Sequence, residues 1–440
     1  MSTVTHVLRP AHFLKFADLW RREGLGPALA RAVYFLRLVL RGEVAGEVAA
    51  QAGGGKAQGG HRFQLAPVWS SLARDRAFHV SKPPAVLTRT RTVAMIGDLN
   101  LPQCRKYRVE QMDELWQAAG VSYRFAHYED VPRCREILQG ATHLMLYRLA
   151  RSDLATMYMY EARRLKLPVL YDIDDPLFSV SAYEGYSNAA ILPAAMRAHF
   201  LSEAPLYLDV MNMADAVSLS TPGLVEHATG YTARPTFLRR NFADRVTLEQ
   251  GARALREARR REGVTLAVAS GSQGHTADLE VIRAPLTRFL EGGRDRRLMI
   301  VGHLDRSVFP GGVQERIEAR PFTDYATYLG NLAEADCALM PLTDDAFNGC
   351  KSGVRVIDAA AVGVASLVSD VGDCRALIVP GETGEIVPAG GWDAALAALA
   401  DDPGGQRAMG AAARRVLERR WGAGLSLPVV DPEMIAWVKA

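Results

Sequence analysis

The stretch FNGCKSGVRVIDAAAVGVASLVSDVGDCRALIVPGETGEIV, residues 347–387, decides the fold class. Residues 354–361 are predicted to form a helix that ends before Gly363, and the short apolar run 365–368 follows as a buried strand. The same alternation of helices and short apolar strands continues outward over most of the chain. Such alternation indicates parallel sheets with helices on both faces and right-handed crossovers.

Two series of short apolar runs are predicted as strands, and a charged stretch, 248–262, separates them. The first series lies at 93–96, 121–125, 143–147, 169–171 and 216–219. The second lies at 265–269, 298–301, 337–340 and 365–368. Helical segments between them include 109–119, 154–165, 279–290 and 324–332. Two doubly wound, Rossmann-like domains are therefore predicted, with ligands at the carboxyl ends of the strands in the cleft between the domains.

The composition is that of a folded, multi-domain enzyme. The chain has 440 residues, of which 49% are apolar and 23% are charged, and this balance excludes wholesale disorder. The net charge of +3 is too small to indicate a nucleic-acid-binding protein. The five cysteines are scattered without a CxxC pair, which argues against a disulfide framework or a zinc ribbon and predicts a reducing, cytoplasmic location.

Residues 1–90 are predicted to form a basic helical extension with a glycine-rich linker. Up to Arg91 the chain contains 14 lysines and arginines against 5 acidic residues. The linker AGGGKAQGG, residues 52–60, is not a P-loop, because Lys56 is followed by Ala where a P-loop has Ser or Thr. As a helix the apolar run 28–40 would rise about 20 Å, too little to span the ~30 Å core of a bilayer.

Two interpretations of this extension stay open. A helix packed on the main body is favoured, because Arg31 and Arg37 point to different helix faces. The alternative is peripheral contact with an anionic membrane surface, since several arginines flank aromatic and aliphatic residues. Beyond the extension, the two domains are predicted at 91–245 and 246–425, and residues 426–440 are predicted to form a helix that crosses back to the first domain.

Two clusters at predicted strand ends suit a phosphate ligand. In SGSQGHT, residues 270–276, glycines permit close backbone approach to a ligand, and a helix N-terminus follows. The alternative there is a plain turn with Thr276 or Asp278 as N-cap. In the second cluster, Lys351 would occupy the first turn of a helix that begins at the natural N-cap Asn348, where a cation is unfavourable unless an anion binds.

Seven residues after Lys351, Asp358 is predicted on the same helix face, about 10 Å along the axis. A lysine at a helix N-terminus would suit a diphosphate, and a carboxylate two turns on would suit sugar hydroxyls. The alternative is a solvated lysine and a surface aspartate.

A third cluster, YDIDDP, contains Asp172, Asp174 and Asp175 after a strand of the first domain. Clustered carboxylates need a metal, a basic partner or solvent. Haloacid-dehalogenase phosphatases have a similar DxD, but they have Thr or Val where this chain has Pro176, so that interpretation is disfavoured. We expect the three aspartates to line the cleft and bind acceptor hydroxyls, with a purely structural role as the alternative.

Taken together, these clusters resemble bacterial glycosyltransferases of the GT-B fold, specifically the retaining family 4 group. The similarity runs from about residue 93 to residue 421, and it includes LPQCRKYRVEQM (101–112), YDIDDPLF and SGSQGHTADLEVI. It implies a nucleotide-sugar donor in the second domain, held by Gly271, Ser272, His275, Asn348, Lys351, Ser352 and Asp358. Among these the resemblance places Lys351 and Ser352 beside the diphosphate and Asp358 at the ribose.

The implied reaction is transfer of a sugar, with retention of configuration, to a glycan or lipid-linked acceptor in cell-surface polysaccharide assembly. Lys351 and Asp358 are the predicted catalytic residues, and neither a cofactor nor a metal is expected. The family commonly has a Glu-x7-Glu pair, whereas this chain has Cys350 at the first position and Asp358 at the second. A degenerate, non-catalytic glycosyltransferase-like subunit or nucleotide-binding module is therefore the alternative.

Overall fold

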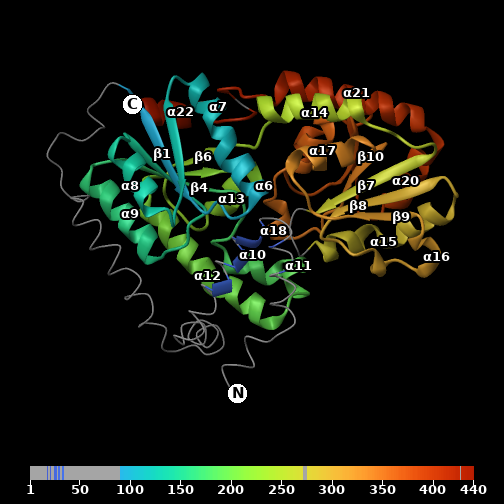
Figure 1. Ribbon diagram of the computed structural model, residues 1–440, viewed down its shortest axis with the longest axis horizontal. Coiled ribbons are helices and arrows are strands. Elements are labelled where there is room, and N and C mark those ends of the chain that lie inside the picture. Colours follow the sequence, from blue (N-terminus) through green and yellow to red (C-terminus); the bar gives the residue numbers. More distant parts are fainter. Residues whose placement is uncertain are drawn as a thin grey trace, which may run out of the picture. The chain divides into compact units, whose positions relative to one another are not determined.

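The computed structural model describes residues 90–270, 275–426 and 428–440, together with isolated positions between residues 17 and 33. The chain divides into two compact units, residues 1–79 and 80–440. In the first unit the described positions 17, 20, 25, 26, 28, 29, 32 and 33 are helical. The predicted linker, residues 52–60, lies outside the described residues. Both Rossmann-like domains belong to the second unit (Figure 1).

In the first domain, the described strands form a parallel six-stranded sheet in the order β2-β1-β3-β4-β5-β6. The strands are β1 (Thr92–Gly97), β2 (Ser122–His127), β3 (His143–Tyr147), β4 (Val169–Ile173), β5 (Ala216–Leu219) and β6 (Thr236–Leu238). The central strands β3 and β4 are buried from end to end, as expected where helices cover both faces. The helices are α6 (Pro102–Cys104), the π-helix η2 (Arg105–Glu110), α7 (Gln111–Ala118), α8 (Val131–Gln139), α9 (Asp153–Arg164), α10 (Val180–Gly185), α11 (Ser187–Ala190), α12 (Ala194–Met213) and α13 (Pro222–Ala228).

In the second domain, the described strands form another parallel six-stranded sheet, in the order β12-β11-β10-β7-β8-β9. The strands are β7 (Val264–Ser270), β8 (Arg296–Gly302), β9 (Ile317–Arg320), β10 (Cys337–Met340), β11 (Ala365–Ser369) and β12 (Gly384–Val387). The helices are α14 (Arg245–Glu257), α15 (Thr276–Glu291), η3 (Arg306–Val308), α16 (Gly311–Gln314), α17 (Tyr325–Ala333), α18 (Ala346–Gly349), α19 (Val354–Ala361), η4 (Gly372–Leu377), α20 (Trp392–Asp401) and α21 (Pro403–Arg420).

The last helix, α22 (Pro432–Lys439), packs on the first domain beside β6 (Figure 1). Just before this helix, Val430 forms an isolated antiparallel β-bridge with Arg239. The Arg91 guanidinium donates to the carbonyl oxygens of Lys439 and Ala440, over 3.3 and 3.0 Å. The C-terminus is therefore tied to the start of the first sheet.

The predicted fold class is confirmed, because both sheets are parallel and doubly wound. In the first sheet the chain adds β2 on one side of β1 and then crosses to the other side of β1 to form β3. In the second sheet it adds β8 and β9 on one side of β7 and then crosses to the other side of β7 to form β10. Ligands of doubly wound sheets bind where the carboxyl ends of such strands diverge. The loops that follow these strands are therefore where a ligand is expected to bind.

Two predicted helix starts are wrong. Asn348 lies inside the short helix α18, whose N-cap is Asp345, and α19 has Gly353 as its N-cap. Lys351 therefore lies in the loop before α19 rather than on a helix face shared with Asp358. The N-cap of α15 is His275 rather than Thr276 or Asp278.

Candidate active site

A cavity of about 310 Å³ lies between the two domains, at the carboxyl ends of both sheets. The first domain contributes the start of the segment after β1 and the loop after β4. The second contributes the loops after β7, β8 and β9 and the start of α19. The polar side chains that line it include Lys106, Tyr107, Asp174, Asp175, His275, Tyr325, Tyr328, Lys351, Ser352, Arg355 and Asp358.

Two cations in this lining have no carboxylate partner among the described residues. The Lys351 ammonium donates to the Tyr186 hydroxyl over 2.8 Å and lies 5.0 Å from the centroid of that ring. The Arg355 guanidinium donates to the backbone oxygen of Ala269 over 3.1 Å. Burial lowers the pKa of Lys351, although nearby carboxylates act against that shift. Lys351 and Arg355 are both partly buried. Charges that are partly removed from water and have no counter-ion are unfavourable, so this wall of the cavity suits an anion.

Asp358 is a buried carboxylate at the same cavity. Its Oδ1 accepts hydrogen bonds from the hydroxyls of Tyr325, over 2.7 Å, and of Tyr107, which belongs to the other domain. Burial raises the pKa of Asp358 to about 6, against the opposing effect of these hydrogen bonds and of Lys106. The Lys106 ammonium lies 4.4 Å from the Tyr325 ring centroid and pairs with Asp244 at 3.2 Å. Asp358 thus joins the two domains within the site.

Arg148 is the basic partner that the acidic cluster needs. Its guanidinium lies 3.1 Å from Asp174 and 3.5 Å from Asp175, and both carboxylates line the cavity. Burial and the neighbouring Asp174 raise the pKa of Asp175. Arg148 directly follows β3 with a φ of 50°, a left-handed conformation that a side chain of this size rarely adopts. Such backbone strain is typical of functional positions.

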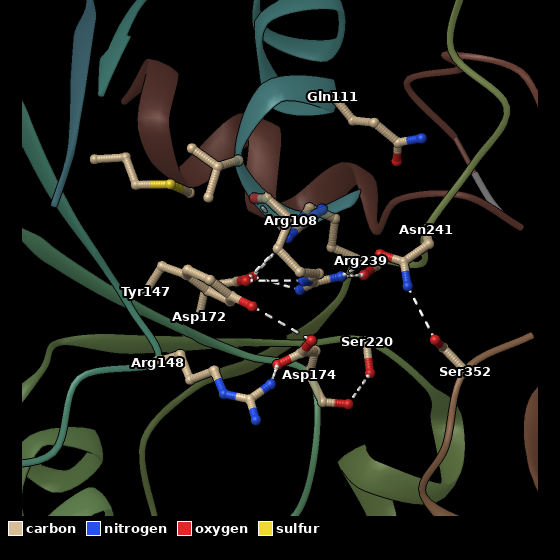
Figure 2. A network of polar contacts seen from close by, with 12 residues as sticks. Arg108, Gln111, Tyr147, Arg148, Asp172, Asp174, Ser220, Arg239, Asn241 and Ser352 are labelled. Atoms are coloured by element: carbon tan, nitrogen blue, oxygen red, sulfur yellow. Dashed lines mark hydrogen bonds and ion pairs between the residues drawn. The ribbon is translucent and has the colours of Figure 1, made fainter. Parts of the chain in front are cut away.

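Asp172 does not line the cavity, so the expectation that it binds acceptor hydroxyls does not fit its position. It is fully buried under the π-helix η2, where it pairs with Arg108 at 2.6 Å and with Arg239 at 2.9 Å (Figure 2). Burial disfavours its charge, but the two guanidinium groups outweigh this and hold its pKa below the usual value. The cluster shown in Figure 2 ties η2 to β4 and to the segment after β6.

Asn348 lies behind the cavity wall rather than on it. Its fully buried side chain donates to Asp278 over 2.9 Å. Asp278 also lies 3.0 Å from Nδ1 of His275 and accepts a 3.0 Å hydrogen bond from the Thr343 amide. Burial lowers the pKa of His275 to about 4, so this ring, which faces the cavity, is neutral at pH 7.

The structure brings together His275, Lys351, Ser352, Asp174, Asp175 and Asp358 of the predicted set. Gly271 and Ser272 lie outside the described residues. Sequence reasoning missed Arg355, although a second cation four residues after Lys351 was a usable signal. It also missed Tyr107, Tyr325 and Tyr328, which come from distant segments and share no local pattern.

Two solved structures share this arrangement of two sheets. Sucrose-phosphate synthase from Thermosynechococcus elongatus is 17% identical, with a TM-score of 0.52 over 79% of this chain and 96% of that one. WaaG, a glycosyltransferase involved in lipopolysaccharide biosynthesis, is 12% identical, with a TM-score of 0.51 over 79% of this chain and all of that one (100%). The chain has the GT-B fold.

Within this GT-B chain, residues 266–402 match the family model described as "Glycosyl transferases group 1". That range holds Lys351, Arg355 and Asp358, which form one wall of the cavity. No curated protein sequence matches the chain. Among the described residues, no group of three or more His, Cys, Asp or Glu side chains could hold a metal ion. In the same part of the chain, no helix has the length and apolar character needed to cross a bilayer.

Proposed function

We propose that this protein is a glycosyltransferase that binds a nucleotide-sugar donor in the cavity between its GT-B domains. The observation that carries the proposal is the wall formed by Lys351 and Arg355, two cations that face the cavity and have no carboxylate partner among the described residues. The match of residues 266–402 to group 1 glycosyl transferases supports the same assignment.

A nucleoside diphosphate suits this wall because its charge is spread over several oxygens. Lys351 offers a point charge, and Arg355 offers a planar fork that binds phosphate oxygens in pairs. When the bond between sugar and phosphate breaks, negative charge grows on the diphosphate. Two cations fixed in place before the reaction stabilise that charge as it develops. Asp358 and the hydroxyls of Tyr107 and Tyr325 are the groups we assign to hydroxyls of the nucleotide's ribose.

The opposite wall supplies the acceptor side of the proposal. Asp174 and Asp175 face the cavity from the first domain, and Arg148 holds both carboxylates. Carboxylate oxygens accept hydrogen bonds from sugar hydroxyls, so this pair suits a glycan or lipid-linked acceptor. Retention of configuration, independence of metal and a role in polysaccharide assembly are parts of the proposal that rest on the family resemblance.

Calorimetric titration with UDP, GDP, ADP and dTDP, with and without magnesium, tests the donor site. We expect one nucleotide to bind without metal. Replacing Lys351 or Arg355 with methionine should weaken that binding about 10- to 100-fold, because each change removes a charge-assisted hydrogen bond of about 1.5–3 kcal/mol.

The matched control is Lys439→Met, which removes an exposed lysine from α22 on the first domain. It should bind nucleotide as the unaltered protein does. If no nucleotide bound, or if the Lys351 and Lys439 variants bound equally well, the donor site would be ruled out. The absence of binding to any nucleotide would favour the degenerate-subunit alternative.

We also propose that the N-terminal extension contacts an anionic membrane surface. Leu25, Leu29 and Val33 are helical, share one helix face through their spacing of four, and are 48%, 48% and 45% exposed. Up to Arg91 the sequence has 14 basic against 5 acidic residues, and this excess favours anionic lipid.

Replacing Leu25, Leu29 and Val33 together with glutamine should lower binding to anionic vesicles by about tenfold or more at low salt, because the apolar face no longer inserts. Val281→Gln, which changes a 40% exposed valine of α15, is the control and should not alter binding. Cosedimentation measures both. Equal binding by the two variants would exclude this face as the contact.

A further inference from the structure

Three consecutive residues of the first domain, 186–188, contact the second domain beside the donor wall. Tyr186 accepts the hydrogen bond from Lys351. The Ser187 amide donates to Asp345 over 3.2 Å. Asn188 donates to Asp278 over 2.8 Å, and its Oδ1 accepts a 3.0 Å hydrogen bond from the Ala277 amide in the first turn of α15. Helix α10, which precedes these residues, packs against α18, and α11, which begins at Ser187, packs against α15 (Figure 1).

Tyr186 holds Lys351 by its hydroxyl, and the Tyr186 ring is itself fixed by stacking. The ring stacks on Phe347, with centroids 4.1 Å apart and planes 11° from parallel. The Lys351 ammonium lies 5.0 Å from the Tyr186 centroid and 5.8 Å from the Phe347 centroid. An ammonium at hydrogen-bond distance from the hydroxyl lies beyond the edge of the Tyr186 ring, so the hydroxyl and not the face of this ring holds it. The 2.8 Å hydrogen bond to the hydroxyl then fixes the direction in which one N–H points.

These partners fix the ammonium without neutralising it. Burial raises the pKa of Tyr186 well above its ordinary value, so the hydroxyl is uncharged. A carboxylate in the same place would cancel the charge on Lys351 and compete with a phosphate. The tyrosine hydroxyl uses one of the three N–H donors of Lys351 and leaves the other two for an anion.

We propose that Tyr186 is a positioning residue for Lys351, supplied to the donor site by the opposite domain. The proposal rests on the assignment of Lys351 to the donor diphosphate. On this proposal, the donor site is complete only when residues 186–188 contact the second domain. Donor affinity and closure of the two domains are then coupled through this one hydrogen bond.

Tyr186→Phe removes the hydroxyl and keeps the stacked ring, so it isolates the hydrogen bond. The matched control is Tyr183→Phe, since Tyr183 lies three residues earlier, in α10, and stacks on Phe200 with centroids 5.6 Å apart. Competitive acylation of the ligand-free protein, read by mass spectrometry over a range of pH, gives the titration midpoint of Lys351. We expect the midpoint to move to lower pH in Tyr186→Phe, because a partner of the charged form is gone. It should stay in place in Tyr183→Phe.

The second measurement is binding of the nucleoside diphosphate that the unaltered protein prefers. Tyr186→Phe should weaken it about 3- to 10-fold, and this effect should vanish when Lys351 is already methionine. If the titration midpoint of Lys351 does not move in Tyr186→Phe, the proposed role of Tyr186 is wrong, whatever the nucleotide affinities are. It is also wrong if Tyr186→Phe weakens nucleotide binding equally with Lys351 and with methionine at position 351. A moved midpoint in a protein that binds no nucleotide leaves the positioning role standing and overturns the proposed function.

Discussion

Replacing Asp172 with asparagine should lower the free energy of unfolding by about 3–5 kcal/mol, a large part of the total stability of an ordinary domain. Asp172 is the carboxylate that pairs with both Arg108 and Arg239, and all three side chains are fully buried. A neutral amide at this position would leave two buried guanidinium groups without a counter-charge. The π-helix η2, β4 and the segment after β6 would lose their common anchor.

Urea unfolding followed by circular dichroism measures this loss. The matched control is Asp393→Asn, because Asp393 also pairs with an arginine, Arg288, at 2.6 Å but on the surface. Water screens such a pair, so the control should unfold close to the unaltered protein. Equal unfolding midpoints for the two variants would show that the buried cluster does not stabilise the domain.

The three aspartates of the acidic cluster therefore differ in what their variants would measure. A loss of activity in Asp172→Ala would report unfolding rather than contact with an acceptor. Asp174 and Asp175, which line the cavity, are the positions where a loss of activity bears on acceptor binding.

Titration of Asp358 should lower the free energy of unfolding as the pH rises from about 4 to about 6. Its pKa lies at about 6 in the folded protein, against an ordinary value of 3.8, because it is buried. Between these values the folded protein keeps a proton that the unfolded chain has lost, so stability falls as the pH rises and is constant above pH 6. A difference of about two pKa units corresponds to about 3 kcal/mol.

Asp358→Asn removes this titration, so its stability relative to the unaltered protein should rise by up to about 3 kcal/mol over the same pH range. Urea unfolding between pH 4 and pH 7.5 measures the difference. Asp401→Asn, at an exposed position at the end of α20, should give a curve parallel to that of the unaltered protein. A parallel curve for Asp358→Asn as well would contradict the assignment.

The sequence was sufficient for the central strands of both sheets and for the edge strand β2, and insufficient for the other three edge strands. Central strands such as β3 and β10 are continuous apolar runs, because both of their faces are covered. The strands that were not predicted, β6, β9 and β12, lie at sheet edges and are three or four residues long. An edge strand that is short and partly exposed has no apolar pattern strong enough to recognise.

Lys351 and Asp358, which were predicted to lie in one site, both line the cavity, but the geometry predicted for them was wrong. A shared helix face was expected, whereas Lys351 lies in the loop before α19 and the fold brings the two to one cavity. The tyrosines could not be predicted in the same way. Tyr107 meets Asp358 across 251 positions of sequence, and only the packing of the two domains creates that contact.

The π-helix η2 imposes a constraint on the length of the chain. Its wider turn directs three successive side chains to different partners: Lys106 to Asp244, Tyr107 to Asp358 and Arg108 to Asp172. Each residue of an α-helix turns the chain by about 100°, so removing one residue here would rotate everything before it away from its partners. The number of residues in η2 is therefore constrained as firmly as the identity of Lys106, Tyr107 and Arg108, and an insertion or deletion here should separate all three from their partners at once.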